Sequence, residues 1–153
     1  MPHARRIMGP RKRGNSIIEF AFFVPWLVFV FVGAMDWGFF AYSLIATEAA
    51  ARIGALYTST SSATVTDATT ACTYAIDQLS KMPNVGGITT CASGTAVTSS
   101  APVGVSATSI TGPDGNPAAQ LSVTYLTPAF IPVPGLLPSK VTITRTFQMR
   151  VRG

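Results

Sequence analysis

Glu19 is the residue whose type and position most need a chemical explanation. It lies near the start of a long apolar segment, RKRGNSIIEFAFFVPWLVFVFVGAMDWGFF, residues 11–40. Placing a carboxylate in a bilayer costs roughly 1–3 kcal/mol or more, depending on its depth. The carboxylate could offset this cost by pairing with a cation on a partner, or it could stay near the cytoplasmic headgroups, close to Arg13. The residues alone leave both interpretations open.

Asp36 is a second carboxylate in the same segment. The rise of a helix places it about 25 Å from Glu19, near the opposite headgroups. We expect an interfacial position, and a contact with a partner helix is the alternative. Gly33 and Gly38 flank it and would allow another helix to approach closely.

Two cysteines, Cys72 and Cys91, follow the apolar segment. Their spacing is not that of a metal site, and no histidine lies near them in the sequence. If this region lies outside the cytoplasm, a disulfide is the natural interpretation. It would close a loop of about 20 residues and stabilise the fold by roughly 3 kcal/mol. Two separate buried thiols are the alternative.

Catalytic residues are scarce in this chain. The single histidine, His3, precedes the apolar segment, so no Cys-His or Ser-His pair is available in the folded part. Asp67, Asp77 and Asp114 fall in a predicted helix and in a P-D-G turn, where capping and solvation explain them. No glycine-rich phosphate loop opens a helix. We therefore expect neither an enzyme nor a cofactor or metal site.

The charge distribution argues against nucleic-acid binding. The net charge is +5, but five of the eleven Lys and Arg residues precede residue 15, and the other six balance the six acidic residues. The basic character therefore belongs to the leader, residues 1–14, and such a leader is typical of a cytoplasmic topology signal. The remainder has no basic patch to hold phosphates.

The predicted elements indicate an α+β protein with one transmembrane helix. A helix is expected over residues 15–57, with the membrane-spanning part at about 20–46, since about 20 apolar residues cross a bilayer. Pro25 should bend or loosen it. Glu48 and Arg52 are four residues apart and can pair on one face. Residues 58–153 would form the extracytoplasmic domain.

That domain should combine a second helix with three or four antiparallel strands. Ala68, Ala71, Cys72, Ala75, Ile76 and Leu79 recur at helical spacing, capped by Thr66 or Asp67 and ended before Pro83. Strands are expected at 103–110, 120–127 and 140–151. The segment 128–139 holds four prolines and cannot be a central strand.

The start of the apolar segment resembles a prepilin cleavage and assembly signal. Gly14 is followed by Asn-Ser-Ile-Ile and then by Glu19 and Phe20, with basic residues directly before the glycine. The stretch RGNSIIEFAFFVPWLVFVFVGAMDWGFFAYSLIATEAAARIGA is most similar to the TadE-like pseudopilins of tight-adherence (Flp-type) pilus systems. The resemblance covers about residues 11–56. The matching positions are Gly14, Glu19, Phe20, Pro25, Gly33, Asp36, Gly38 and the Ala-Ala-Arg of residues 50–52. Ile53 and Leu56 depart from the acidic and basic residues common in that family.

This resemblance implies a structural role in pilus assembly. A prepilin peptidase would cut after Gly14 on the cytoplasmic side, making Asn15 the new N-terminus. Glu19 would then neutralise the new amine, either one helical turn away or on a neighbouring subunit. The implied partners are other pseudopilins, the pilus-assembly platform proteins and the bacterial inner membrane.

Two other classes share part of this pattern. A secretory signal peptide also has a basic start, but its apolar core spans about 7–15 residues and the present one is nearly twice as long. Cleavage near residues 49–51 would then release a small β-rich protein. A plain single-pass membrane protein has the same topology as a pseudopilin and differs only in processing and partners.

Overall fold

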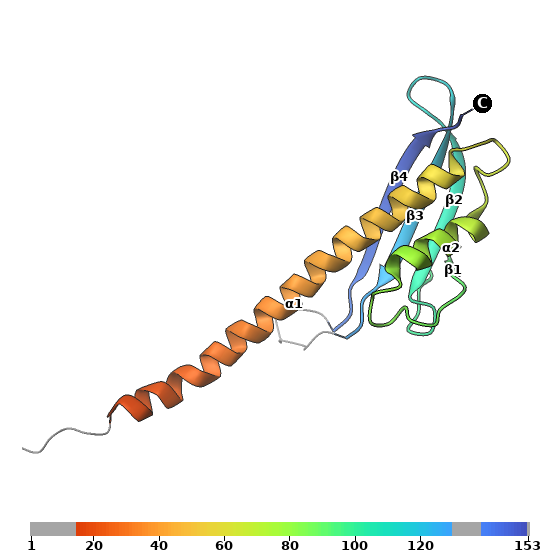
Figure 1. Cartoon of the computed structure of the whole chain (residues 1–153). Coiled ribbons are helices and arrows are strands. Elements are labelled where there is room, and N and C mark those ends of the chain that lie inside the picture. The colour runs from red at the N-terminus through yellow and green to blue at the C-terminus, as the bar shows by residue number, and fades with distance from the viewer. Residues whose placement is uncertain (1–14, 130–138, 153) are drawn as a thin grey trace, which may run out of the picture. The chain divides into compact units, whose positions relative to one another are not determined.

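A computed structural model of the chain describes residues 15–129 and 139–152. The elements follow in the order α1, α2, β1, β2, β3 and β4 (Figure 1). The chain divides into two compact units, Met1–Met35 and Asp36–Gly153. The second unit contains two helices and a four-stranded sheet, which confirms the predicted α+β class.

Helix α1 spans Asn15–Thr58, close to the predicted 15–57. Residues 46–56 are rich in alanine, the strongest helix former, which favours a helix in that part of the sequence. The helix continues through Pro25. Proline has no N–H to donate, so the carbonyl of Ala21 lacks its usual helical donor at this point.

Helix α2 spans Ala68–Leu79, as the apolar spacing predicted. Of the two proposed caps, Asp67 is the one used: its Oδ1 accepts a hydrogen bond from the backbone N–H of Thr70 at 3.0 Å. That bond and a second one from the hydroxyl of Tyr57 hold the pKa of Asp67 below its usual value. The cap therefore ties the start of α2 to the C-terminal part of α1.

The sheet has the strand order β1-β2-β3-β4. Strand β2 (Val103–Thr111) pairs antiparallel with β3 (Pro117–Leu126), which pairs antiparallel with β4 (Thr142–Arg150). These three strands are the ones that the sequence predicted. The turn between β2 and β3 contains Asp114, whose Oδ1 accepts from the backbone N–H of Asn116 at 3.2 Å.

The prediction that all strands of the sheet are antiparallel is wrong for β1. Strand β1, Ala92–Ser93, pairs parallel with β2, so the sheet is mixed. Cys91 is bonded to α2 directly before this strand, and the backbone N–H of Gly94 donates to the carbonyl of Val105 at 3.2 Å directly after it. The disulfide thus holds this segment beside β2, where it runs parallel to that strand. No signal in the sequence indicated this pairing.

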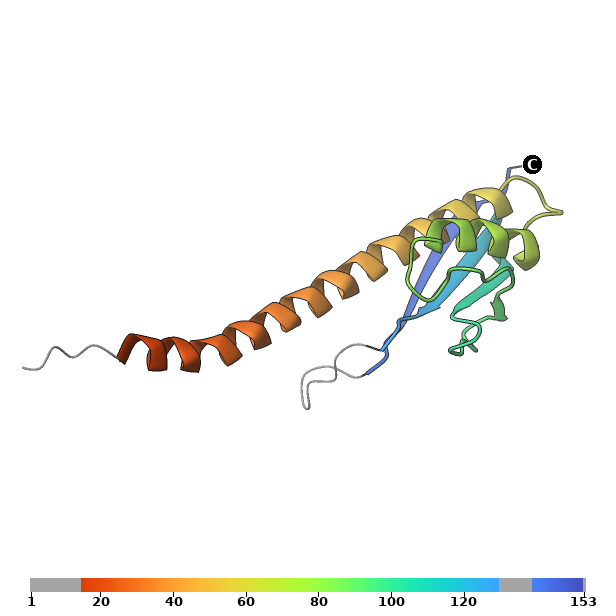
Figure 2. The same ribbon diagram turned by 60° about the horizontal axis from the view of Figure 1, so that its bottom comes forward.

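Both helices pack on the same face of the sheet (Figure 2). The part of α1 closest to the sheet consists of small buried residues, Ala50, Ala51, Gly54 and Ala55. Larger residues of the same helix, Phe39, Phe40, Leu44 and Tyr57, are partly buried against the core. A Cβ added at Gly54 would overlap Cδ2 of Leu121, a side chain that is itself completely buried. Glycine is therefore needed here for the close approach of the helix to β3.

The opposite face of the sheet is polar. Hydroxyl groups pair across β3 and β4, at 2.8 Å between Ser122 and Thr146 and at 3.1 Å between Thr124 and Thr144. The side chain of Gln148 donates to that of Gln120 at 3.1 Å. The sheet thus has one apolar face toward the helices and a more polar face on the other side, where Thr124 is nevertheless almost fully buried. Most of the proline-rich segment, residues 130–138, lies outside the described residues.

Replacing Gly54 by alanine should destabilise the domain. The extra methyl group collides with Leu121, and overpacking of this kind costs roughly 1–3 kcal/mol, partly offset by a gain of about 1 kcal/mol in helix propensity. Gly38→Ala in the same helix is the matched control, because no atom lies within 4 Å of its added Cβ. Denaturant unfolding of the full chain in detergent micelles measures both. An equal change in the free energy of unfolding of the two variants would contradict the close packing at Gly54.

Candidate functional site

The N-terminal part of α1 presents large apolar side chains on all sides. Every residue from Ile17 to Phe31 is exposed in the structure. Ile17 is 79% exposed and Phe22 is 83% exposed, values far from those of a core helix. By length and composition this helix could cross a membrane, and it is the only such helix among the described residues. Its apolar surface indicates a single-pass membrane anchor.

Glu19 and Phe20 lie on this exposed surface, with Phe20 66% exposed. Asn15 is the first residue of α1, and Gly14 lies outside the described residues. The structure therefore places Glu19 in the first turns of the helix, four residues after the position that a cut after Gly14 would make the N-terminus. Pro25 follows about a turn and a half later and is also exposed.

Asp36 has an environment that the sequence did not indicate. The residue is half-buried, and its Oδ2 is buried without a hydrogen-bond partner among the described residues. Gly33 and Gly38, which flank it, have open space where a Cβ would lie. The structure thus leaves room for a neighbouring helix at both glycines, and the role of this group stays a prediction.

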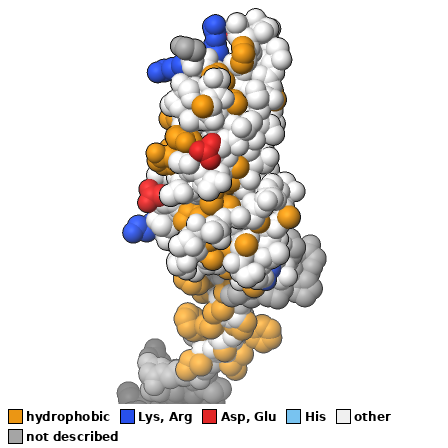
Figure 3. Space-filling model, turned by 90° about the vertical axis from the view of Figure 1, so that its right-hand side faces the viewer, with side chains coloured by type: hydrophobic (Ala, Val, Ile, Leu, Met, Phe, Trp, Pro, Cys, Tyr) orange, Lys and Arg blue, Asp and Glu red, His pale blue; other side chains and the backbone are white. Residues whose placement is uncertain are grey.

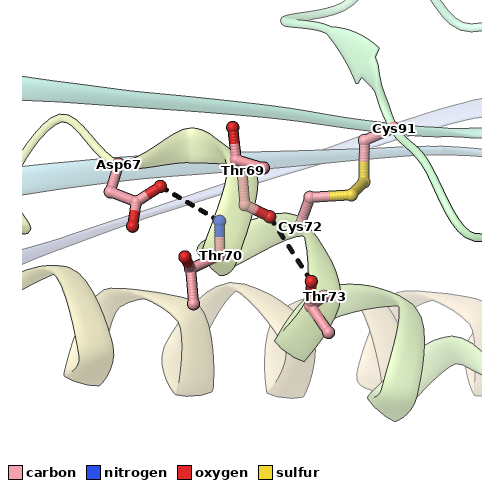
Figure 4. The surroundings of a disulfide bond; sticks show 6 residues. All are labelled: Asp67, Thr69, Thr70, Cys72, Thr73 and Cys91. Atoms are coloured by element: carbon pink, nitrogen blue, oxygen red, sulfur yellow. Dashed lines mark hydrogen bonds between the residues drawn. A yellow bond between two sulfur atoms is a disulfide. The ribbon is translucent and has the colours of Figure 1, made fainter.

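The two cysteines are joined, as the sequence predicted. Cys72 of α2 and Cys91 form a disulfide with a Cα–Cα distance of 5.9 Å (Figure 4). The bond lies one turn into α2, close to the hydrogen bond between Asp67 and Thr70 that begins this helix. The disulfide fastens α2 to the chain directly before β1, and the cap ties α2 to α1, so their role here is structural.

The predicted pairing of Glu48 with Arg52 is not formed in the part of the chain that the structure describes. The guanidinium of Arg52 instead lies over the ring of Phe147 on β4, 5.5 Å from its centroid. Such cation–π contacts stabilise by about 0.5–1 kcal/mol at exposed sites. Tertiary packing therefore gave Arg52 a neighbour far away in the sequence.

One buried polar pair, Tyr125 with Asn84, was not predicted from the sequence. The hydroxyl of Tyr125 donates to Oδ1 of Asn84, whose Nδ2 donates to the carbonyl of Leu126 at 2.7 Å. Burial raises the pKa of Tyr125 to about 12. Asn84 follows a proline in a turn-rich stretch, so nothing in its local sequence distinguished it from a solvent-exposed turn residue.

Metal-ligating side chains are not gathered in the described part of the chain. No group of three or more His, Cys, Asp and Glu residues there could hold a metal ion. Figure 3 shows hydrophobic side chains scattered among uncharged polar atoms on this face of the domain, with few charged groups.

These features define an α+β protein with an N-terminal helix that indicates single-pass membrane anchoring. Residues 14–56 match the family model of the TadE-like proteins. This match confirms the resemblance found in the sequence over nearly the same residues. No curated protein and no solved structure matches the chain.

An anchoring helix should persist in the mature protein. We expect protein extracted from washed membranes of its native host to yield a peptide that includes residues 33–42. A cleaved secretory signal passes the same test of length and composition, but it would release a chain that lacks this peptide. Mass spectrometry of the membrane and soluble fractions distinguishes the two. A soluble chain beginning near residues 49–51 would contradict the anchor.

Proposed function

We propose that this protein is a minor pseudopilin that takes part in assembly of a tight-adherence (Flp-type) pilus. The observation that supports this most strongly is the TadE-like match over residues 14–56, which starts one residue before α1 begins at Asn15. The TadE-like family is pilus-associated and structural, so we propose a structural rather than a catalytic role.

The first step in this proposal is processing after Gly14 by a prepilin peptidase. Glycine before the cut lets the backbone lie extended in a protease cleft without a side-chain clash. The cut removes five positive charges that favour a cytoplasmic location of the leader. Without them, the helix could be drawn out of the bilayer into an assembling bundle.

The second step is neutralisation of the new amine by Glu19. The α-amino group at Asn15 would be largely protonated near neutral pH. Glu19 would meet it within one helical turn or on a neighbouring subunit, in surroundings where a charge pair interacts more strongly than in water. The carboxylate would thereby favour assembled subunits over isolated ones.

The third step is burial of the exposed aromatic surface of α1 against other pseudopilin helices. In lipid this burial gives little hydrophobic gain, so packing at small residues and polar contacts would determine which helices associate. For these contacts we propose Gly33, Asp36 and Gly38. Pro25 would bend the helix before them. The assembly platform proteins and the inner membrane complete the proposed surroundings.

Processing can be tested on protein purified from membranes of the native host. We expect the intact mass of a chain that begins at Asn15, and Gly14→Val should give a chain that retains the leader because valine hinders binding of the peptide in the cleft. Gly33→Val is the control: it lies far from the cut, so this variant should still begin at Asn15. A wild-type chain that still carries residues 11–14 would reduce the protein to a plain membrane anchor.

The role of Glu19 can be separated from insertion. Glu19→Ala and the nearly isosteric Glu19→Gln should both leave the protein in the membrane and lower the number of pili per cell, by tenfold or more if the pair contributes about 1.4 kcal/mol to assembly. Glu48→Gln, a change of another exposed carboxylate on the same helix, should not lower it. Electron microscopy and membrane fractionation give the two readouts. Normal piliation in both Glu19 variants would refute the proposed contact.

A further inference from the structure

Strand β4 forms one edge of the sheet, and no strand among the described residues pairs with its outer side. Just beyond its end, the N–H of Arg152 donates to the carbonyl of Ser59 at 2.9 Å, so the loop after α1 meets the edge there. At the other edge, β1 has only two residues, whereas β4 has nine and pairs with β3 without a bulge. Natural proteins usually shorten, bend or cover such edges, or place charged residues on them, because unpaired backbone groups invite another strand. Strand β4 carries charged residues, Arg145 and Arg150, and both are positive. A long regular edge therefore needs an explanation.

The hydrogen bonds at both ends of the ladder show which groups face outward. The N–H of Thr127 donates to the carbonyl of Val141 at 2.9 Å, and that of Val151 donates to the carbonyl of Pro117 at 3.0 Å. In an antiparallel pair, hydrogen-bonded and non-bonded positions alternate. The odd-numbered residues of β4 thus bond to β3, and the even-numbered ones direct their N–H and C=O groups to the free edge. These even-numbered residues are Thr142, Thr144, Thr146, Gln148 and Arg150.

The edge is strongly basic. All four arginines in the described part of the chain lie on β4, just after it, or on α1 against it. They are Arg52, Arg145, Arg150 and Arg152. Of these four, Arg150 forms the one ion pair within that part of the chain: it is 3.7 Å from Asp114, and both side chains are well exposed.

Among these arginines, Arg145 has a buried N–H group that lacks an acceptor among the described residues. Its odd position places its side chain on the same face of the sheet as Ile143 and Phe147, toward the helices, and it is half-buried. Its Nε is buried without a hydrogen-bond partner among the described residues. A buried guanidinium N–H without an acceptor costs stability, so this group lacks a partner that a carboxylate could supply.

There is also room beside the edge. An open hollow of about 890 Å³ lies between the end of α1 and the end of β4, lined in part by Leu56, Ser59 and Met149. Leu56 is 51% exposed, so this hollow offers an apolar contact next to the basic groups. A strand added to β4 could place alternate side chains there.

We propose that the free edge of β4 binds an extended segment of another protein that carries carboxylates on alternate residues. The segment would add a fifth strand to the sheet, with backbone hydrogen bonds to the even-numbered residues and a carboxylate near Arg145. A second copy of this chain fits less well, because none of its four strands contains Asp or Glu, and pairing β4 with itself would bring two sets of arginines together. This inference rests on the sheet and its charges and does not depend on the pilus role.

The test is site-specific photocrosslinking of the full chain in membranes of its native host. A photoreactive amino acid at Thr144 probes the edge, and the same group at Thr108, which is exposed on β2, serves as the control position. We expect an adduct from position 144 only. The attached peptide should come from another protein and carry Asp or Glu at alternate residues.

Two variants test the binding mode within the same experiment. Gln148→Pro removes an N–H that faces the free edge and should lower the adduct yield at least fivefold, whereas Gln148→Val keeps that N–H and should not. Arg145→Gln, which leaves the backbone unchanged, should also lower the yield at least fivefold, and this variant decides the matter if the proline variant fails to fold. The proposal is overturned by an adduct with a second copy of the chain, by equal adducts from Thr108, or by no adduct from Thr144.

Discussion

The close approach of α1 to the sheet is the contact on which the domain depends. Gly54 lies where any larger residue would collide with the buried Leu121, and alanines occupy the neighbouring inward positions of the helix. Small residues bring little apolar area of their own, but they let the backbone of α1 lie near large side chains of β3 and β4. At this contact the core combines small helix residues with bulky strand residues such as Tyr125, Val123 and Leu121.

This arrangement fixes which surfaces of α1 remain free. Within the domain, the inward face holds Ser43, Thr47 and Ala51, all completely buried, while Tyr42, Ile45 and Leu56 stay exposed. The hydroxyls of Ser43 and Thr47 bond to carbonyls four residues earlier, so these buried polar groups are satisfied within the helix. The residues before Met35 have no such inward face, and their apolar side chains need lipid or other helices. Each large side chain would otherwise expose surface whose burial is worth about 1.5–3 kcal/mol.

Polar and covalent contacts add to this core in the rest of the domain. The disulfide joins α2 to β1, the Asp67 cap begins α2, and Asn84 ties a turn to Tyr125 and the end of β3. Hydroxyl and amide pairs cover the solvent face of β3 and β4. Such a sheet is stable with one face in water, and it leaves its long basic edge accessible.

The sequence by itself determined the elements whose signals are local. The length and hydropathy of α1, the helical spacing of α2 and the positions of three strands follow from local sequence patterns, and all agree with the structure. The Gly14–Glu19–Phe20 pattern likewise identified the TadE-like segment, because it depends on residue types at fixed spacing. Tertiary structure alone decided the parallel pairing of β1, the stacking of Arg52 on Phe147 and the buried pair of Asn84 and Tyr125. It also decided that the Nε of Arg145 is buried without a hydrogen-bond partner among the described residues. These features depend on contacts between residues far apart in the chain, which a local sequence pattern does not show.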